Sequence, residues 1–181
     1  MKRPLKLVIV ALLLGVIAWF AYDLCTTPPM RSSNDRNAAA SLKTVATAQS
    51  DYQSNDRDGN GKNDYWRGDI AGLYMVKGKD GQEIKLIEVS IAYADVRPLT
   101  EFEKHLSAPK SGYRFRALRF ADEKIPDPDR FAAIAFPDTE KSGKAMFIIS
   151  HENQMFRKKA VPGGVEIYPT DPIKEGWEKM D

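Results

Sequence analysis

The chain contains very few of the residues from which disulfides, zinc sites and catalytic bases are made. Among its 181 residues are one cysteine, Cys25, and two histidines, His105 and His151. A single cysteine excludes an internal disulfide, and without a cysteine pair or two histidines at helical spacing a zinc site has no starting point. We expect both histidines at the surface, His105 near the end of a short helix and His151 in a hairpin turn.

Motifs for nucleophilic catalysis and for phosphate binding are lacking as well. Ser111-Gly112 and Ser142-Gly143 do not have the context of a nucleophile elbow, and Gly59 and Gly61 lie in an acidic segment that would repel phosphate. The sequence shows no recognisable pair of a nucleophile and a base. The sequence therefore predicts that the protein is not an enzyme and needs no cofactor, with calcium the one ion left to test.

A single long apolar run lies near the amino terminus. Lys2, Arg3 and Lys6 precede LVIVALLLGVIAWFAY, and the stretch from Leu5 to Leu24 is 20 residues long. That is about the length that crosses roughly 30 Å of hydrocarbon as a helix. We interpret residues 1–24 as a transmembrane signal anchor in the cell inner membrane. The basic end stays in the cytoplasm, so the rest of the chain is expected to be extracytoplasmic.

A cleaved signal peptide is the alternative interpretation of this segment. Its apolar region is usually shorter, about 7–15 residues, and ends in small residues. Here the run ends AWFAYDLCTT, with bulky side chains where a peptidase requires small ones, and Leu24 before Cys25 disfavours a lipoprotein. At the membrane edge, lipidation of Cys25 or its pairing with a second copy stays open.

Outside the anchor the charges balance. The whole chain has 27 Lys and Arg against 25 Asp and Glu; residues 1–24 hold three basic residues and one acidic residue, so 24 of each sign remain. A neutral domain with interspersed charges lacks the electrostatic footprint of a nucleic-acid binder. We therefore expect the membrane as a partner and no nucleic acid.

The pattern after the anchor predicts one helix followed by strands. CTTPPMRSS, residues 25–33, reads as a stalk because its two prolines cannot continue a helix. Leu42, Val45 and Tyr52 then fall on one face of a helix expected from about Asp35 to Gln53. Alternation and β-branched residues predict strands, and one short helix is expected at 99–107. The expected strands are 73–76, 84–92, 113–120, 131–136, 145–150 and 154–159.

These elements predict an α+β fold: an N-terminal transmembrane helix, then a long helix packed on an antiparallel sheet. The predicted organisation has three parts. They are the transmembrane signal anchor at 1–24, the stalk at 25–33, and an extracytoplasmic α+β domain at 34–181.

The segment NDRDGNGKNDYW, residues 55–66, is the one candidate ion-binding site. With Asp56 at the first position of a calcium-loop template, Asp58, Asn60 and Asp64 fall at further ligand positions, and Lys62 at the position that uses a backbone carbonyl. Calcium takes about six to eight oxygen ligands, and alternate side chains of a tight loop can supply several.

The same segment also fits a plain turn. The twelfth template position, which should be a bidentate glutamate, is Arg67. Asp58-Gly59 and Asn60-Gly61 are both turn dipeptides of the kind that link a helix to a strand. Calcium binding and a simple turn are thus both open from the sequence.

Two long segments carry a family resemblance. AAASLKTVATAQSDYQSNDRDGNGKNDYWRGDIAGLY, with the later GYRFRAL and RFAAIAFPDTEKSGKAMFIISHENQMF, resembles type IV pilin-like and type II secretion pseudopilin-like proteins, in a poorly characterised bacterial, planctomycete-type branch. The resemblance implies a pilin-like domain over roughly residues 34–160. The chain lacks a recognisable prepilin cleavage motif: Gly15 lies inside the apolar run, and Phe20 stands where the family has glutamate.

Together, the anchor and the resemblance predict a single-pass membrane-anchored envelope protein. The pilin-like extracytoplasmic domain is expected to have a structural or interaction role, with other envelope proteins and secretion or adhesion machinery as partners. The alternative function is an extracytoplasmic module that binds a small molecule or calcium. A hydrolase ranks last because the nucleophile–base pair is missing.

Overall fold

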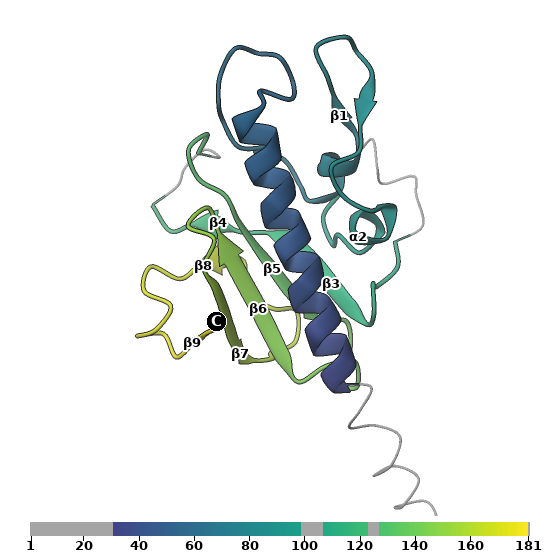
Figure 1. Cartoon of the computed structure of the whole chain (residues 1–181). Coiled ribbons are helices and arrows are strands. Elements are labelled where there is room, and N and C mark those ends of the chain that lie inside the picture. Colours follow the sequence, from purple (N-terminus) through teal and green to yellow (C-terminus); the bar gives the residue numbers. More distant parts are fainter. Residues whose placement is uncertain (1–30, 99–106, 123–126, 181) are drawn as a thin grey trace, which may run out of the picture.

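The centre of the computed structural model, which describes residues 31–98, 107–122 and 127–180, is a five-stranded antiparallel sheet. Its strand order is β3-β5-β6-β7-β9 (Figure 1). The strands are β3 (Tyr113–Ala117), β5 (Ala132–Pro137), β6 (Ala145–Ser150), β7 (Met155–Lys159) and β9 (Glu178–Lys179). The predicted anchor at 1–24 and all but the last residue of the predicted helix at 99–107 lie outside the described residues.

The two central strands are apolar on both faces. All six residues of β5, AAIAFP, are buried, and so are five of the six residues of β6, AMFIIS. Strands read as continuous apolar runs when both faces of their sheet are covered. Across the strands, Ala135 of β5 stands between Phe115 of β3 and Phe147 of β6, so a small side chain separates two large ones.

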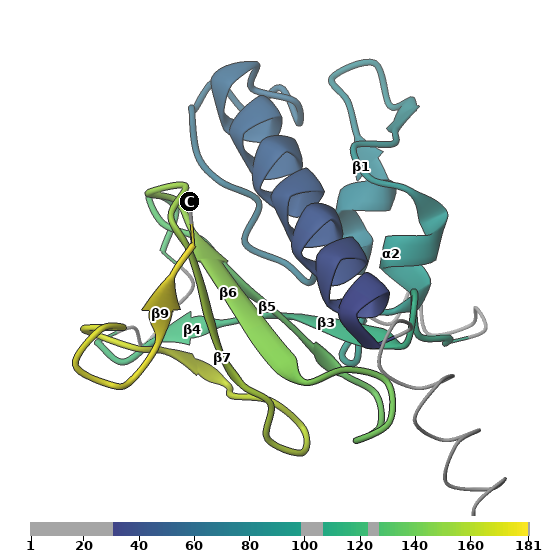
Figure 2. The ribbon, with the colours of Figure 1, turned by 60° about the horizontal axis from the view of Figure 1, so that its bottom comes forward.

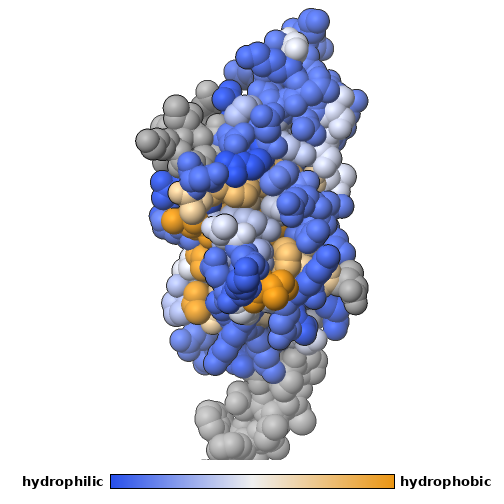
Figure 3. Space-filling view, turned by 90° about the vertical axis from the view of Figure 1, so that its left-hand side faces the viewer, coloured by the Kyte–Doolittle hydropathy of each residue, from blue (hydrophilic) through white to orange (hydrophobic). Residues whose placement is uncertain are grey.

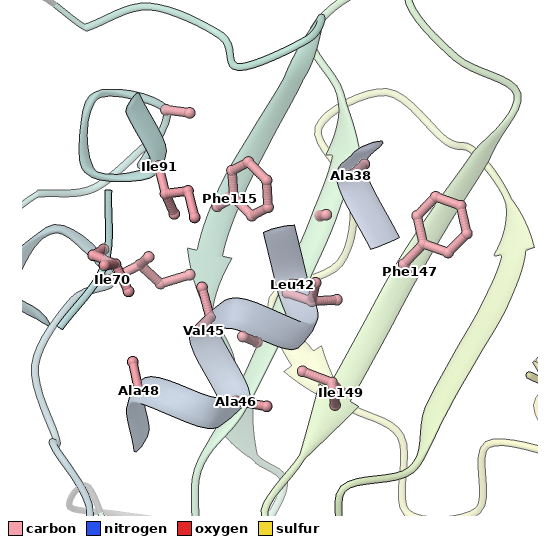
Figure 4. Packing of buried hydrophobic residues seen from close by; sticks show 14 of the residues in the cluster. Ala38, Leu42, Val45, Ala46, Ala48, Ile70, Ile91, Phe115, Phe147 and Ile149 are labelled. Carbon is pink, nitrogen blue, oxygen red and sulfur yellow. The ribbon is translucent and has the colours of Figure 1, made fainter. Parts of the chain in front are cut away.

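One face of the sheet is covered by helical segments. Residues 31–54 are helical, and beside them lie η1 (Ala71–Tyr74) and α2 (Val89–Tyr93) (Figures 1 and 2). Leu42 is fully buried in one cluster with Phe115 and Phe147 (Figure 4). Burying such a side chain contributes roughly 1.5–3 kcal/mol, so this apolar stripe holds the helical segment in place.

The opposite face has its own apolar cluster, closed by the last part of the chain. Ile134 of β5, Ile148 of β6 and Phe156 of β7 belong to it. Tyr168 and Trp177 cover it. Tyr168 belongs to β8 (Ile167–Tyr168), which pairs in parallel with β4 (Arg119–Phe120). The sheet is therefore the middle of three layers.

The outer surface is mostly polar. On the face shown in Figure 3, apolar residues form separate spots among hydrophilic ones. Three large apolar side chains are exposed among the described residues: Val161, Ile167 and Ile173. A small hairpin of β1 (Val76–Lys77) and β2 (Glu83–Ile84) projects from the helical side (Figure 1).

The fold class predicted from the sequence is wrong as it was stated. The described body is rich in strands, its helical layer contains η1 and α2 as well as residues 31–54, and the minor β4–β8 sheet is parallel. Of the predicted strands at 73–76 and 84–92, residues 73–74 belong instead to η1 and residues 89–92 to α2, and only Val76 and Ile84 are in strands. Buried Ile87, Ile91 and Ala94 recur every three to four residues, which is helical spacing that the β-branched composition concealed.

A helix able to cross a membrane is not found in residues 31–98, 107–122 and 127–180.

Residues 31–33, the last part of the predicted stalk, are helical, and residues 25–30 lie outside the described residues.

Candidate functional site

The loop that follows helix 31–54 is tightly coiled. Asp56 has a positive φ of 43°, and Gly59 and Gly61 have φ values of 67° and 81°. Glycine adopts this left-handed conformation without the steric cost that a Cβ would bring. A Cβ on Gly59 would also lie 2.6 Å from Cβ of Lys79, so the loop packs closely against the β1–β2 turn.

The predicted ligand side chains turn toward each other and toward backbone N–H groups of the same loop. The Asp56 Oδ2 accepts from the Gly61 N–H at 3.0 Å, and the Asn60 Oδ1 accepts from the Lys62 N–H at 2.7 Å. The Asn60 side-chain amide donates to Asp58 Oδ2 at 2.8 Å. It also lies 3.5 Å from Asp64 Oδ1. Asp56, Asp58, Asn60 and Asp64 are thus brought together.

One oxygen of this loop has no partner. The Oδ1 atom of Asp56 is buried and accepts no hydrogen bond from the described residues. A buried carboxylate oxygen without a donor is costly, by about 1–3 kcal/mol. A cation at this position would remove that cost.

Other features weigh against a preformed ion site. Groups of three or more His, Cys, Asp or Glu side chains placed to hold a metal ion are not found in the described part of the chain. Arg67 is exposed at the template's last position, and Asp69, two residues further on, accepts from the Gly72 N–H at 3.0 Å in η1. In the described residues, the loop therefore does not form a complete set of ligands for a metal ion.

The loop is coupled to the core through Tyr52. Its hydroxyl is hydrogen-bonded to Asp58; burial first, and then this bond and the Asp58 charge, raise the pKa of Tyr52. Burial by itself would raise the pKa of Asp58, but hydrogen bonds from Tyr52 and the Asn60 backbone outweigh it and lower that pKa. Asp58 is thus held as the anion, the form that a cation would need.

Two carboxylates elsewhere, of which Asp95 is buried and Asp35 is half-buried, have structural partners. Asp95, 1% exposed, accepts from the backbone N–H groups of Ala71 and Arg97, each at 2.9 Å. Asp35 accepts from the Tyr113 hydroxyl at 2.5 Å and from the Lys144 N–H at 3.2 Å. These bonds join chain segments far apart in the sequence.

A second candidate region surrounds His151, which is half-buried and not a plain surface residue. Its ring lies edge-on to Phe120, with centroids 5.9 Å apart, and its Nδ1 is buried without a partner among the described residues. A hollow of about 500 Å³ lies here, lined in part by Ser150 and Tyr168. Ser150 is 1% exposed, so its hydroxyl is poorly placed for attack on a substrate. His105 lies outside the described residues.

A third region, which sequence reasoning missed, is a hollow of about 710 Å³ between residues 137–144 and 159–163. Its residues belong to two loops separated along the chain, so no sequence motif could reveal it.

Comparison with known proteins gives no family for this chain: no family model matches it, and neither a curated protein nor a solved structure is significantly similar to it.

Proposed function

We propose that this chain is a single-pass inner-membrane protein whose domain, residues 31–181, has an interaction role outside the cytoplasm. The proposal rests on the hydrogen bonds that hold the first turn of helix 31–54 against the rest of the domain. Asn34 Nδ2 donates to the Ser142 carbonyl at 2.9 Å, and Asp35 accepts from Tyr113 and Lys144. The body is thereby fixed to the chain only a few residues after the apolar run that ends at Leu24.

Such an attachment suits a domain that works at the membrane surface. A loosely tethered domain would explore a large volume, whereas a short connection keeps it near the membrane and near other envelope proteins. The polar contacts around Asp35 and Asp95 hold the fold together. This use of buried polar groups supports an interaction role over catalysis.

Membrane fractionation tests the topology. The full chain should stay with membranes through carbonate extraction, and protease added to spheroplasts should digest the domain. The intact amino terminus should be present in the membrane-bound protein. A mature amino terminus near residues 22–26 would show that the apolar run is a cleaved signal peptide, and the proposed anchor would be wrong.

The partner class is a separate question, for which the resemblance to pseudopilins suggests secretion machinery. Crosslinking in intact membranes followed by purification of the full chain should recover envelope or secretion components. Recovery of the protein alone, at crosslinker concentrations that capture a known envelope complex, would argue against this partner class.

The second candidate function is weak calcium binding by the loop at 55–66. The specific observation in its favour is the unpartnered, buried Oδ1 of Asp56. The ligands would be Asp56, Asp58, Asn60 and Asp64 through their side chains and Lys62 through its carbonyl. With Arg67 in place of the bidentate glutamate, we expect affinity in the ~10⁻⁴–10⁻³ M range of extracellular modules.

Thermal unfolding in calcium and in chelator tests this candidate. Ligand at a hundredfold excess over Kd would stabilise the folded state by about 2.7 kcal/mol, and Asp58→Ala should abolish the difference. Asp80→Ala is the matched control, because Asp80 is also an exposed turn residue whose Oδ1 accepts from the Gln82 N–H at 3.0 Å. Identical melting of the wild type with and without calcium would reduce the segment to a turn.

A further inference from the structure

The hollow of about 710 Å³ lies at the end of the sheet where helix 31–54 begins. Arg31 Nε donates to the Lys141 carbonyl at 3.2 Å, and Asn34 Nδ2 donates to the Ser142 carbonyl at 2.9 Å. The first turn of the helix and the β5–β6 connection therefore sit side by side, as the lower part of Figure 1 shows. One wall of the hollow therefore lies next to Arg31 and Asn34, which are close in the sequence to the apolar run.

Two lysines stand next to each other on this hollow. Lys159 ends β7, and the following Ala160 N–H donates to the Lys144 carbonyl at 3.0 Å. Both side chains are exposed, as is that of Lys141. Ion pairs to these three lysines are not formed by any of the described residues. The local positive charge is therefore uncompensated by salt bridges.

The acidic residues nearby leave an excess of positive charge. Asp138 also lines the hollow, but its Oδ1 lies 2.7 Å from Arg114 Nε, so its charge is matched. Glu140 is exposed and lines the hollow, and it forms no ion pair with any described residue. The charge of Glu140 alone opposes the three positive charges of Lys141, Lys144 and Lys159 on this surface of the described residues.

The same hollow has an apolar rim. Val161, which is 43% exposed, and Pro162 are part of its lining. A surface with both lysines and exposed apolar groups suits the boundary between lipid headgroups and acyl chains, where such side chains are stabilised.

Covalent geometry keeps this end near the membrane. Arg31 is seven residues after Leu24, the end of the apolar run. Seven residues span at most about 25 Å even when fully extended. If the run is an anchor, as the proposed function holds, the start of the helix cannot be farther than this from the hydrocarbon.

We propose that the surface around Lys144 and Lys159 docks on anionic lipid headgroups of the membrane that holds the anchor. This proposal rests on the proposed function. It identifies the partner of the end of the domain at which helix 31–54 begins. The lysine ammonium groups donate to headgroup phosphates, and Val161 and Pro162 contact the glycerol region. Docking would fix the orientation of the domain, with the loop at 55–66 at the far end of helix 31–54 turned away from the membrane.

The test uses the full chain reconstituted into two kinds of vesicle. One kind is phosphatidylcholine alone, and in the other about one lipid in three is phosphatidylglycerol. A water-soluble acetylating reagent labels exposed lysines, and mass spectrometry gives the rate at each position. Lys144 and Lys159 should be acetylated at least about threefold more slowly in the anionic vesicles. Lys79, in the β1–β2 turn, should react equally in both.

Added salt and lysine variants test whether the protection depends on charge. In about 1 M salt, where the screening length falls to about 3 Å, the protection should disappear. A Lys144→Gln, Lys159→Gln double variant should lose the protection of Lys141, and a Lys77→Gln, Lys79→Gln control should retain it. Circular dichroism checks that both variants are folded.

Equal acetylation rates in the two vesicles would overturn the proposal. Protection in phosphatidylcholine vesicles by added inorganic phosphate, to the same degree, would indicate a soluble-anion site and would also overturn it. Failure of the anchor itself gives a different result, because the protein would then not float with either vesicle.

Discussion

At the scale of single residues, the buried polar groups of this domain bridge distant parts of the chain. The Tyr113 hydroxyl on β3 donates to Asp35 of helix 31–54 at 2.5 Å and lies 2.8 Å from the Ala145 carbonyl on β6. Gly143 leaves room for this hydroxyl, since a Cβ there would lie 2.1 Å from it. Neither the partner nor the need for glycine is visible in the local sequence.

Asp95 gives a prediction for the effect of pH on stability. Burial raises the pKa of its carboxyl above the ordinary value of 3.8, although the Arg97 and Ala71 N–H groups oppose this, and the charge of Asp69 adds to the rise. Between 3.8 and the raised folded-state pKa, the folded protein therefore binds more protons at this site than the unfolded chain. The contribution of Asp95 to the free energy of unfolding then falls as pH rises through this window.

Urea denaturation at several pH values checks this sign. Asp95→Asn, which cannot titrate, should show a smaller loss of stability than the wild type as pH rises from about 4 to about 7. Because other carboxyls titrate in both proteins, the difference between the two curves is the quantity to compare. Parallel curves would mean that Asp95 titrates normally in the folded state.

At the scale of elements, apolar spacing was a better guide than residue type. The predicted strands at 131–136, 145–150 and 154–159 agree with β5, β6 and β7 to within one residue at each end. In the segments that became η1 and α2, β-branched residues suggested strands, yet the buried positions repeat at helical spacing. Intrinsic preference for strand is weak and yields to packing.

Leu42 tests the packing of helix 31–54. The side chain is 0% exposed among Phe115, Phe147 and their neighbours, so Leu42→Ala should lower the free energy of unfolding by about 2–5 kcal/mol. The adjacent Lys43 is exposed, and Lys43→Ala should change it by no more than about 0.5 kcal/mol. Chemical denaturation followed by circular dichroism measures both. Similar midpoints for the two variants would mean that Leu42 is not in the core.

At the scale of the whole molecule, one sheet serves two apolar clusters. Along β5, Ala133 and Ala135 belong to the cluster on the helical side, and Ile134 and Phe136 to the other. Because neighbouring residues of the same strand enter both clusters, neither layer can lose its packing while the sheet stays intact. The domain should therefore unfold as one cooperative unit.

Two tryptophans can report on the two layers separately. Trp66 packs beside Tyr52 on the helical side, with ring centroids 5.7 Å apart, and Trp177 is 4% exposed in the opposite cluster. In a Trp19→Phe background, Trp66→Phe and Trp177→Phe each leave one reporter. Within each variant, the fluorescence and circular dichroism midpoints in denaturant should coincide. A lower midpoint reported by Trp177 would show that the final segment detaches on its own.

What the sequence determined by itself is local. The apolar run before Leu24, the helical stripe through Leu42 and the turn residues of the loop at 55–66 all follow from spacing and residue type within one segment. The antiparallel core strands could be predicted for the same reason, since their apolar runs and the turns between them are contained within a few residues.

Tertiary structure decided what depends on contacts between distant segments. The parallel pairing of β4 with β8 joins residues 119–120 to 167–168, and the hollow with Lys144 and Lys159 is closed by two separate loops. The hydrogen bonds among the side chains of the loop at 55–66, with Asp56 Oδ1 left unpartnered among the described residues, follow from side-chain directions that a motif does not specify. Two-residue strands such as β8 and β9 are too short to leave a periodic signal, so only packing against the rest of the chain places them.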